Sequence, residues 1–221
     1  MYKTETHLHT AEVSGCAHVS AKEMVKAYAE AGYTTVFITD HYKKRYFELL
    51  GDIPWEEKIE KYLSGYMLAR EEGEKLGIHV LFAIELTFKD GWNDYLVYGI
   101  TPDFLRTHPR LHESSIEEFY SFAKSFGFLV IQAHPFRNNE CFPTPEYVDG
   151  FEIYNSNPRH KDYSEKTETL VKENNLLYTA GSDAHQDEDI GLSGVLSDFP
   201  ISNADDFIRL IESGCATIIK K

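Results

Sequence analysis

The sequence lacks the paired cysteines, basic clusters and long apolar runs that mark several large classes of protein. Its three cysteines stand far apart and form no CxxC pair, so neither a disulfide framework nor a cysteine-based zinc site is indicated. Lysine and arginine number 22 against 36 aspartates and glutamates. The resulting net charge of −14 disfavours nucleic acids and anionic membranes as partners. No apolar run approaches the roughly 20 residues that a membrane span needs.

The N-terminus also lacks a signal-peptide pattern, so we expect a cytoplasmic globular protein. A length of 221 residues, 42% of them hydrophobic, fits one domain over residues 1–221 with a sizeable core. No sequence feature indicates an oligomeric state.

Short apolar runs alternate with helical patterns along the chain. We expect strands over residues 4–8, 34–38, 79–84, 95–99, 128–132, 150–154, 176–180 and 216–219, and helices over residues 21–31, 54–76, 115–125, 162–173 and 203–212. This alternation implies parallel strands with helices packed outside. With about seven strands, an α/β fold of the TIM-like barrel type is favoured, and its working groups would lie at the C-terminal strand ends.

Histidines and carboxylates gather at these expected strand ends. They are His7, His9, Asp40, His41, Glu85, His134, Asp183 and His185. Residues i and i+2 of a strand share a face, so His7 and His9 can approach one ion, as can Asp183 and His185 if the chain stays extended. A lone buried histidine is usually a hydrogen-bonded core residue, but that reading does not explain the whole set. Imidazole and carboxylate ligands suit Zn, Mn or Fe.

Five short pieces of the sequence stand in a specific order and spacing: HLHT at 7–10, ITDH at 38–41, AIE at 83–85, AHPFR at 133–137 and GSDAH at 181–185. Together they resemble the PHP (polymerase and histidinol phosphatase) family of metal-dependent phosphoesterases. The resemblance implies a distorted seven-stranded β/α barrel with up to three metal ions at its C-terminal face. The ligands that it implies are His7, His9, Glu85 and Asp183 for one ion, Glu85 and His134 for a second, and His41 and His185 for a third.

Two positions depart from the commonest pattern of that family. Asp94 stands where many members carry a histidine, and it is either a carboxylate ligand of the second ion or a turn residue. After His9, either Glu12 or His18 could complete the third site. Glu12 is favoured because a short loop returns it to the ion, whereas His18 stands just ahead of the expected helix.

The expected reaction is hydrolysis of a small phosphomonoester by a hydroxide that bridges the metal ions. We expect about two to three such ions per chain, divalent or trivalent Zn, Mn or Fe. Asp40, beside His41, is expected to assist catalysis by orienting a ligand or a water. Arg137, Arg159 and His160 are expected to bind the phosphate of a small phosphorylated metabolite, with surface ion pairing as the alternative reading.

Two other functions stay open at this point. Amidohydrolase barrels also begin with HxH on the first strand, and a non-catalytic, metal-stabilised regulatory barrel would keep the same fold without turnover. Glu85 and the Asp183-x-His185 pair favour a phosphoesterase over an amidohydrolase, and the nearly complete ligand set favours an enzyme. The basic residues 43–45 either guide an anionic substrate or form a solvated loop.

Overall fold

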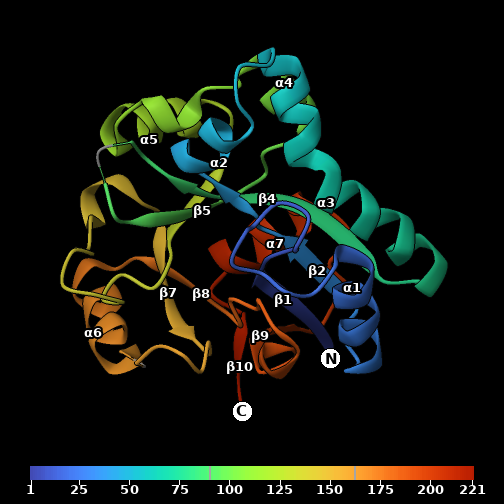
Figure 1. Cartoon of the computed structure of the whole chain (residues 1–221). Helices are drawn as coiled ribbons and strands as arrows, with labels where there is room; N and C mark the ends of the chain where they lie inside the picture. Colours follow the sequence, from blue (N-terminus) through green and yellow to red (C-terminus); the bar gives the residue numbers. More distant parts are fainter. Residues whose placement is uncertain (90, 162) are drawn as a thin grey trace.

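The computed structural model describes residues 1–89, 91–161 and 163–221, over which ten strands form one mixed sheet that curls into a nearly closed barrel (Figure 1). The strands are β1 (Tyr2–Leu8), β2 (Thr35–Ile38), β3 (His41–Tyr42), β4 (His79–Thr87), β5 (Asp94–Tyr98), β6 (Leu129–Gln132), β7 (Gly150–Asn155), β8 (Leu177–Gly181), β9 (Ser193–Ser197) and β10 (Thr217–Lys220). Their order in the sheet is β10-β9-β1-β2-β4-β5-β6-β7-β8, with β3 added beside β4.

Helices surround this sheet in Figure 1. They are α1 (Ala21–Glu30), α2 (Lys44–Leu49), α3 (Trp55–Leu76), α4 (Pro102–Thr107), α5 (Ile116–Ser125), α6 (Ser164–Asn174) and α7 (Ala204–Glu212), with short 3-10 helices η1 (Leu111–Glu113), η2 (Pro145–Tyr147) and η3 (Asp187–Asp189). None of the helices over the described residues has the length and apolarity that a membrane crossing demands.

Helix ends follow the capping signals of the sequence. Ser20 caps α1, and Glu23 completes a capping box with it. The long helix α3 begins after Pro54 and ends at Gly77, whose φ of 72° is the left-handed conformation that glycine adopts readily. The helix expected over residues 162–173 is α6, and its expected first residue, Asp162, lies outside the described residues.

The parallel part of the sheet brings the C-terminal ends of several strands to one rim. β1 pairs with β2, and β2 pairs with β4, both in parallel. β3 then continues beyond β2 and pairs with β4 so that His41 stands opposite Glu85. Two residues that lie far apart in sequence are therefore neighbours because of strand register alone.

The expectation of seven parallel strands is wrong in both number and direction. β5 runs antiparallel to β4 and β6, and β9 runs antiparallel to β1 and β10. The connection from Thr87 to Asp94 is too short for a parallel crossover, which needs roughly a dozen residues. The chain therefore reverses, and Asp94 at the start of β5 comes to lie at the same rim as the end of β4.

The barrel closes where β1 ends. β1 pairs with β9 only over Tyr2–Thr4. Beyond that, the backbone N–H of His9 donates to Ala184 O at 2.9 Å, and the N–H of Ala184 donates to His7 O at 3.3 Å. On the inner side, Phe207 of α7, which lies behind the strands in Figure 1, packs on Phe37 at a centroid distance of 4.7 Å. α7 thus packs against this side of the strands through Phe207, Leu210 and Ile211, while the end formed by His7, His9 and Ala184 carries polar groups.

Candidate metal centre

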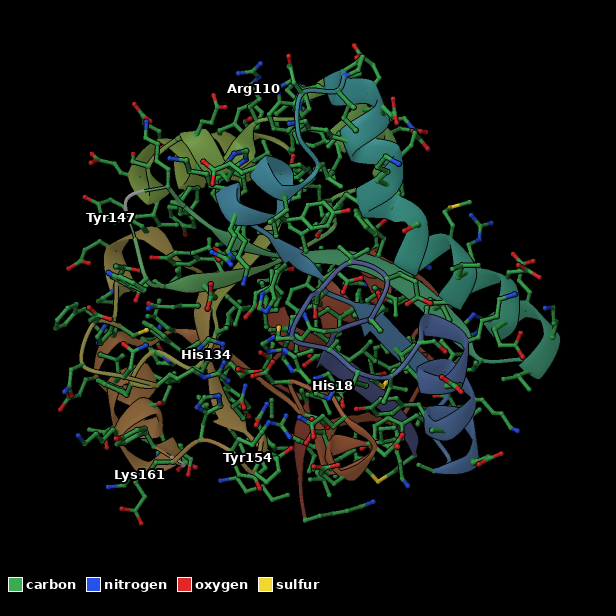
Figure 2. All side chains as sticks on the ribbon, in the orientation of Figure 1. His18, Arg110, His134, Tyr147, Tyr154 and Lys161 are labelled. Carbon is green, nitrogen blue, oxygen red and sulfur yellow. The ribbon has the colours of Figure 1, made fainter. Side chains whose placement is uncertain are left out.

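A buried carboxylate, Glu85 of β4, lies at the centre of four histidines. His7 Nε2 is 3.2 Å and His134 Nε2 is 3.1 Å from Glu85 Oε1. His9 Nε2 is 3.4 Å and His41 Nδ1 is 2.5 Å from Glu85 Oε2. These five residues come from β1, β3, β4 and the loop after β6, and Figure 2 labels His134 beside β7. One carboxylate therefore contacts imidazoles from both sides of the site.

Two further carboxylates extend this arrangement. Asp183, in the loop after β8, has its Oδ1 3.1 Å from His9 Nε2 and 3.4 Å from His7 Nε2. Asp94 lies farther out, with Oδ2 3.9 Å from His134 Nε2, and the hydroxyl of Thr87 donates to its Oδ1 at 2.5 Å. Asp94 is thus held by the β4–β5 turn on the side of His134.

The candidate ligand atoms form overlapping groups within 4.8 Å of one another: His7, His9 and Glu85; His7, His134 and Asp183; Glu85, Asp94 and His134; and His9, His41 and His185. We call His7, Glu85, Asp94, His134 and Asp183 the carboxylate-rich cluster, and His9, His41 and His185 the three-histidine cluster. His9 links them, because its Nε2 is also 3.2 Å from His7 Nε2.

Close contacts between buried polar atoms show that these clusters fit metal cations. Glu85 Oε2 and His41 Nδ1 are both buried and lie 2.5 Å apart as an ion pair whose geometry does not make a hydrogen bond. The two Nε2 atoms of His7 and His9 also point at each other. Buried polar atoms without partners are costly, and a cation between such lone pairs would satisfy them. Zn, Mn and Fe all accept this combination of imidazole and carboxylate.

The charge of the carboxylates and of His9 matches what ligation requires, whereas neighbouring carboxylates outweigh burial and raise the pKa of His7 well above its usual value and that of His41 to about 10, so these two rings would release a proton on binding a metal. Burial raises the pKa of Glu85, but His41 and His7 more than offset this and hold it well below its usual range. The pKa of Asp183 is likewise well below its usual range, because Arg137 and His7 outweigh its burial. Burial and the neighbouring His185 hold the pKa of His9 well below its usual value. Ionised carboxylates and a neutral imidazole are the forms that bind metals.

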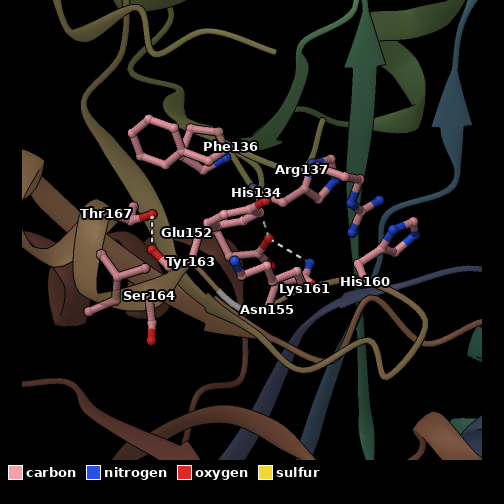
Figure 3. Close-up of a pocket in the computed structure, with 12 residues that line it drawn as sticks. His134, Phe136, Arg137, Glu152, Asn155, His160, Lys161, Tyr163, Ser164 and Thr167 are labelled. Carbon is pink, nitrogen blue, oxygen red and sulfur yellow. Dashed lines mark hydrogen bonds between the residues drawn. The ribbon is translucent and has the colours of Figure 1, made fainter. Parts of the chain in front are cut away.

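Glu152 of β7 is a functional residue that the sequence reasoning missed. It is buried, and its Oε1 lies 2.9 Å from His7 Nδ1. Its Oε2 accepts from the backbone N–H of His134 at 3.2 Å and from Asn155 Nδ2 at 2.8 Å, as Figure 3 shows. A carboxylate behind a ligating histidine fixes the ring orientation and leaves the other nitrogen for the metal. The available signal was a glutamate within an otherwise apolar strand.

Two candidate ligands have unusual backbone conformations. His134 and Asp183 have φ values of 30° and 50°, in the left-handed region that costs a non-glycine residue roughly 1–3 kcal/mol. The chain after β8 is therefore not extended, so the condition under which Asp183 and His185 could approach one ion is not met, and the two residues fall in separate candidate groups, as the family resemblance implies. Because of the bend, Asp183 lies in the carboxylate-rich cluster and His185 lies in the three-histidine cluster. The ring of His185 also contacts the bend itself, since its Nδ1 is 2.8 Å from the backbone oxygen of Asp183.

Asp40 lies beneath the site rather than in either cluster. Its Oδ1 accepts from the backbone N–H of Thr10 at 2.8 Å and from Ser14 Oγ at 2.7 Å, and its Oδ2 accepts from Thr10 Oγ1 at 2.7 Å. Ser14 Oγ is also 3.2 Å from His9 Nδ1. Burial raises the pKa of Asp40 to about 6, although these hydrogen bonds act to lower it. Asp40 therefore reaches a candidate ligand through Ser14, and its role in catalysis stays a prediction.

The loop between β1 and α1 places its polar residues differently from the sequence-based expectation. Glu12 is exposed, and its Oε2 accepts from the backbone N–H of Ala21 at the start of α1 at 2.9 Å. His18, labelled in Figure 2, is exposed as well. Neither belongs to a candidate metal group of the described residues. In the same loop, burial raises the pKa of the Cys16 thiol, but His185 and His41 outweigh it and lower that pKa to about 6.

The three residues expected to bind substrate have distinct surroundings. Arg137 contacts Asp183 through Nη2, while its Nε is buried and has no partner among the described residues. Arg159 makes two hydrogen bonds to Asp189, at 2.8 and 2.6 Å, and Asp189 also accepts from the backbone N–H of His185. His160 lines a pocket together with Arg137 (Figure 3). Arg137 is thus nearest to the clusters, and Arg159 supports the loop of His185.

Comparison with known proteins agrees with this geometry. Among solved structures, a Bacteroides vulgatus two-domain protein described as containing a predicted PHP-like metal-dependent phosphoesterase has a TM-score of 0.71 and 17% identity, over 99% of this chain and 64% of that one. This chain therefore spans less than two thirds of that protein. PsfC from Pseudomonas syringae has a TM-score of 0.69 and 16% identity, over 100% of this chain and 91% of its own.

An amidohydrolase from Chromobacterium violaceum, solved with bound sulfate and no metal, has a TM-score of 0.58 and 15% identity over 96% of both chains. At these identities the likenesses establish the fold alone. No curated protein matched this chain. The sequence itself matches the PHP domain family over residues 5–211, so the chain belongs to the PHP domain family.

Proposed function

We propose that this chain hydrolyses a small phosphomonoester with the help of about two to three bound Zn, Mn or Fe ions. The observation that carries the proposal is the convergence of imidazoles and carboxylates on Glu85, directly beside an arginine whose Nε has no partner among the described residues. Bound divalent ions would lower the pKa of a coordinated water and offset charge on phosphate oxygens, which is the chemistry that ester hydrolysis needs.

Arg137 is the side chain best placed to recognise the phosphate. Its guanidinium lies at Asp183, and only 16% of the side chain is exposed. A guanidinium binds two phosphate oxygens at once, and here Nε is a buried donor that a phosphate oxygen would satisfy. Arg137 would therefore fix the phosphate against the carboxylate-rich cluster and stabilise the charge that develops on it.

A second pocket, beside His41, could hold the organic part of the substrate. It has a volume of about 530 Å³, within the range of small-molecule sites. Lys43 and Arg45 line it together with the apolar side chains of Tyr46 and Leu50. This mixture suits a phosphorylated metabolite that carries a further polar or anionic group, and it gives the basic residues after His41 a role in attracting the substrate.

The direct test is phosphate release by protein purified without chelator, with its metal content measured, against a panel of phosphomonoesters, amides and lactones. We expect phosphate release in wild type and none in Glu85→Gln, which keeps the size of the side chain but removes its charge. Turnover of amides or lactones alone would instead support an amidohydrolase. Bound metal with no turnover of any substrate would support a non-catalytic barrel.

A further inference from the structure

Glu5 of β1 is a fully buried carboxylate that belongs to none of the candidate metal groups of the described residues. Its Oε1 accepts from the backbone N–H groups of Thr6, His7 and Ser182, each at 2.9 Å. Its Oε2 accepts from Tyr28 Oη at 2.8 Å and from Ser182 Oγ at 2.6 Å. A buried carboxylate with five such donors is satisfied within the protein, so it acts on the chain rather than on an ion.

The first segment that Glu5 holds is the irregular end of β1. The register between β1 and β2 shifts between Glu5 and Leu8, and His7 lies within this shift. Irregularities of this kind redirect side chains beside functional sites. Because Glu5 accepts the backbone N–H of His7, it stabilises the local conformation from which His7 reaches the carboxylate-rich cluster.

The second segment that Glu5 holds is the bend after β8. Ser182, which donates to Glu5 through both its backbone N–H and its hydroxyl, directly precedes Asp183. Ser182 Oγ also accepts from the backbone N–H of Ser193 on β9 at 3.1 Å. A residue such as Asp183, with a φ of 50°, keeps that conformation only where its surroundings determine it. Glu5 supplies part of this constraint one residue before Asp183.

The two segments approach each other closely without being paired as strands. β1 and β8 are not neighbours in the order of the sheet. The hydroxyl of Thr6 donates to Ala180 O at 2.8 Å. A Cβ added at Gly181 would lie 2.5 Å from the Cβ of His7, so a residue other than glycine would push the segments apart. Hydrogen bonds from side chains of β1 therefore do here what strand pairing does elsewhere in the barrel.

We propose that Glu5 is a positioning residue of the metal centre, whose carboxylate fixes the backbone of His7 against that of Asp183. His7 and Asp183 belong to one candidate metal group, and His7 Nε2 lies 3.4 Å from Asp183 Oδ1. A ligand that is present but misplaced weakens metal binding, so residues that fix ligands contribute to affinity. The effect depends on the reach of the carboxylate, because the hydrogen bonds join two separate segments. This inference rests on the metal-binding part of the proposed function.

Two variants at this position separate the reach of the side chain from its charge. Glu5→Asp keeps the charge but is one methylene shorter, so we expect it to lose the hydrogen bonds to either His7 or Ser182. Glu5→Gln keeps the length, and its amide oxygen can accept the backbone N–H bonds while its NH2 group donates to the hydroxyl oxygens. Isothermal titration with zinc should show binding at the carboxylate-rich cluster about tenfold weaker in Glu5→Asp, and within about threefold of wild type in Glu5→Gln.

Tyr28→Phe is the matched control, because it removes a hydrogen bond of Glu5 without touching either backbone segment. It should lower the Tm and keep the zinc affinity of wild type. A purely structural role for Glu5 would give that same pattern in Glu5→Asp and would overturn the inference.

The remaining outcomes are equally decisive. Zinc binding as weak in Glu5→Gln as in Glu5→Asp would show that charge matters rather than reach, and would also overturn the inference. Either of these results leaves the proposed function standing. Wild-type protein that binds no zinc, manganese or iron would overturn both.

Discussion

The carboxylate-rich cluster and the three-histidine cluster share a rim but are built in different ways. The first is set by strand ends and by a buried carboxylate behind a ligand, since Glu85 lies on β4 and Glu152 orients His7. The second consists of imidazoles alone, and His185 reaches it beyond the bend at Asp183. Strand register contributes to both clusters, since His41 stands opposite Glu85, and the main difference between the clusters is their charge.

Under the proposed function, this difference would give the two clusters separate roles. The carboxylate-rich cluster carries most of the negative charge and contacts Arg137, so it suits the ions that act on the phosphate. The three-histidine cluster opens toward the pocket lined by Lys43 and Arg45, so it suits an ion that aids substrate binding. Variants that damage one cluster should therefore leave the other measurably intact.

The largest effect should come from Glu85, which contacts both clusters. Glu85→Gln should lower kcat/KM for a phosphomonoester at least about 1,000-fold, equivalent to about 4 kcal/mol. Asp94→Asn should lower it only about tenfold, because Asp94 contacts one histidine at 3.9 Å. Steady-state kinetics and metal content of the two variants check this. Equal, small losses in both variants would be incompatible with a central role for Glu85.

Metal removal tests how far the clusters stabilise the fold. At about 100 times Kd, each bound ion adds about 2.7 kcal/mol, which corresponds to about 5–10 °C in Tm for a chain of this size. We expect chelation to lower the Tm of wild type by at least that amount and to change the Tm of Glu85→Gln by less than half as much as that of wild type. Thermal unfolding followed by circular dichroism gives the answer, and an unchanged wild-type Tm would argue against metal ligation.

Glu152 tests the carboxylate-rich cluster without touching a ligand directly. Glu152→Gln should weaken metal binding there about 10–100-fold, because the carboxylate no longer fixes the ring of His7. Isothermal titration with the metal is the measurement, and the three-histidine cluster should keep its affinity. Loss of binding at both clusters to the same extent would show that they are not separate.

Gly65 offers the matching test of the three-histidine cluster, with the smallest expected effect. A Cβ at this position of α3 would overlap Thr10 Oγ1 and lie 2.9 Å from Asp40 Oδ2, so the β1–α1 loop would have to shift. Gly65→Ala should therefore weaken the affinity for one metal ion about tenfold. Gly73→Ala, farther along α3 and crowded by Val80, is the control for damage to the helix alone. Similar metal binding by both variants would refute the link.

The members of both clusters could be named from the sequence for a physical reason. His7, His9, His41 and Glu85 lie on or next to strands, where alternation and parallel register determine which side chains meet. The family resemblance added Asp94, whose position at the rim depends on a chain reversal that periodicity does not reveal.

The surroundings of the ligands were not predictable in the same way. Glu152 orients His7 from a strand that lies 145 residues away in sequence, and no local pattern encodes that contact. Glu12 is closer to His9 in sequence than His18 is, but its carboxylate accepts a hydrogen bond from the backbone N–H at the start of α1. Loop conformation depends on partners such as Asp40 and His185, which meet the loop only in the folded chain.

The most direct test of the account is phosphate release as a function of bound metal per chain, in protein first stripped by a chelator and then titrated with Zn, Mn or Fe. We predict no phosphate release from the stripped protein, an increase as ions bind, and a plateau at about two to three ions. Undiminished phosphate release by the stripped protein, or none from any phosphomonoester by fully loaded protein, would contradict it.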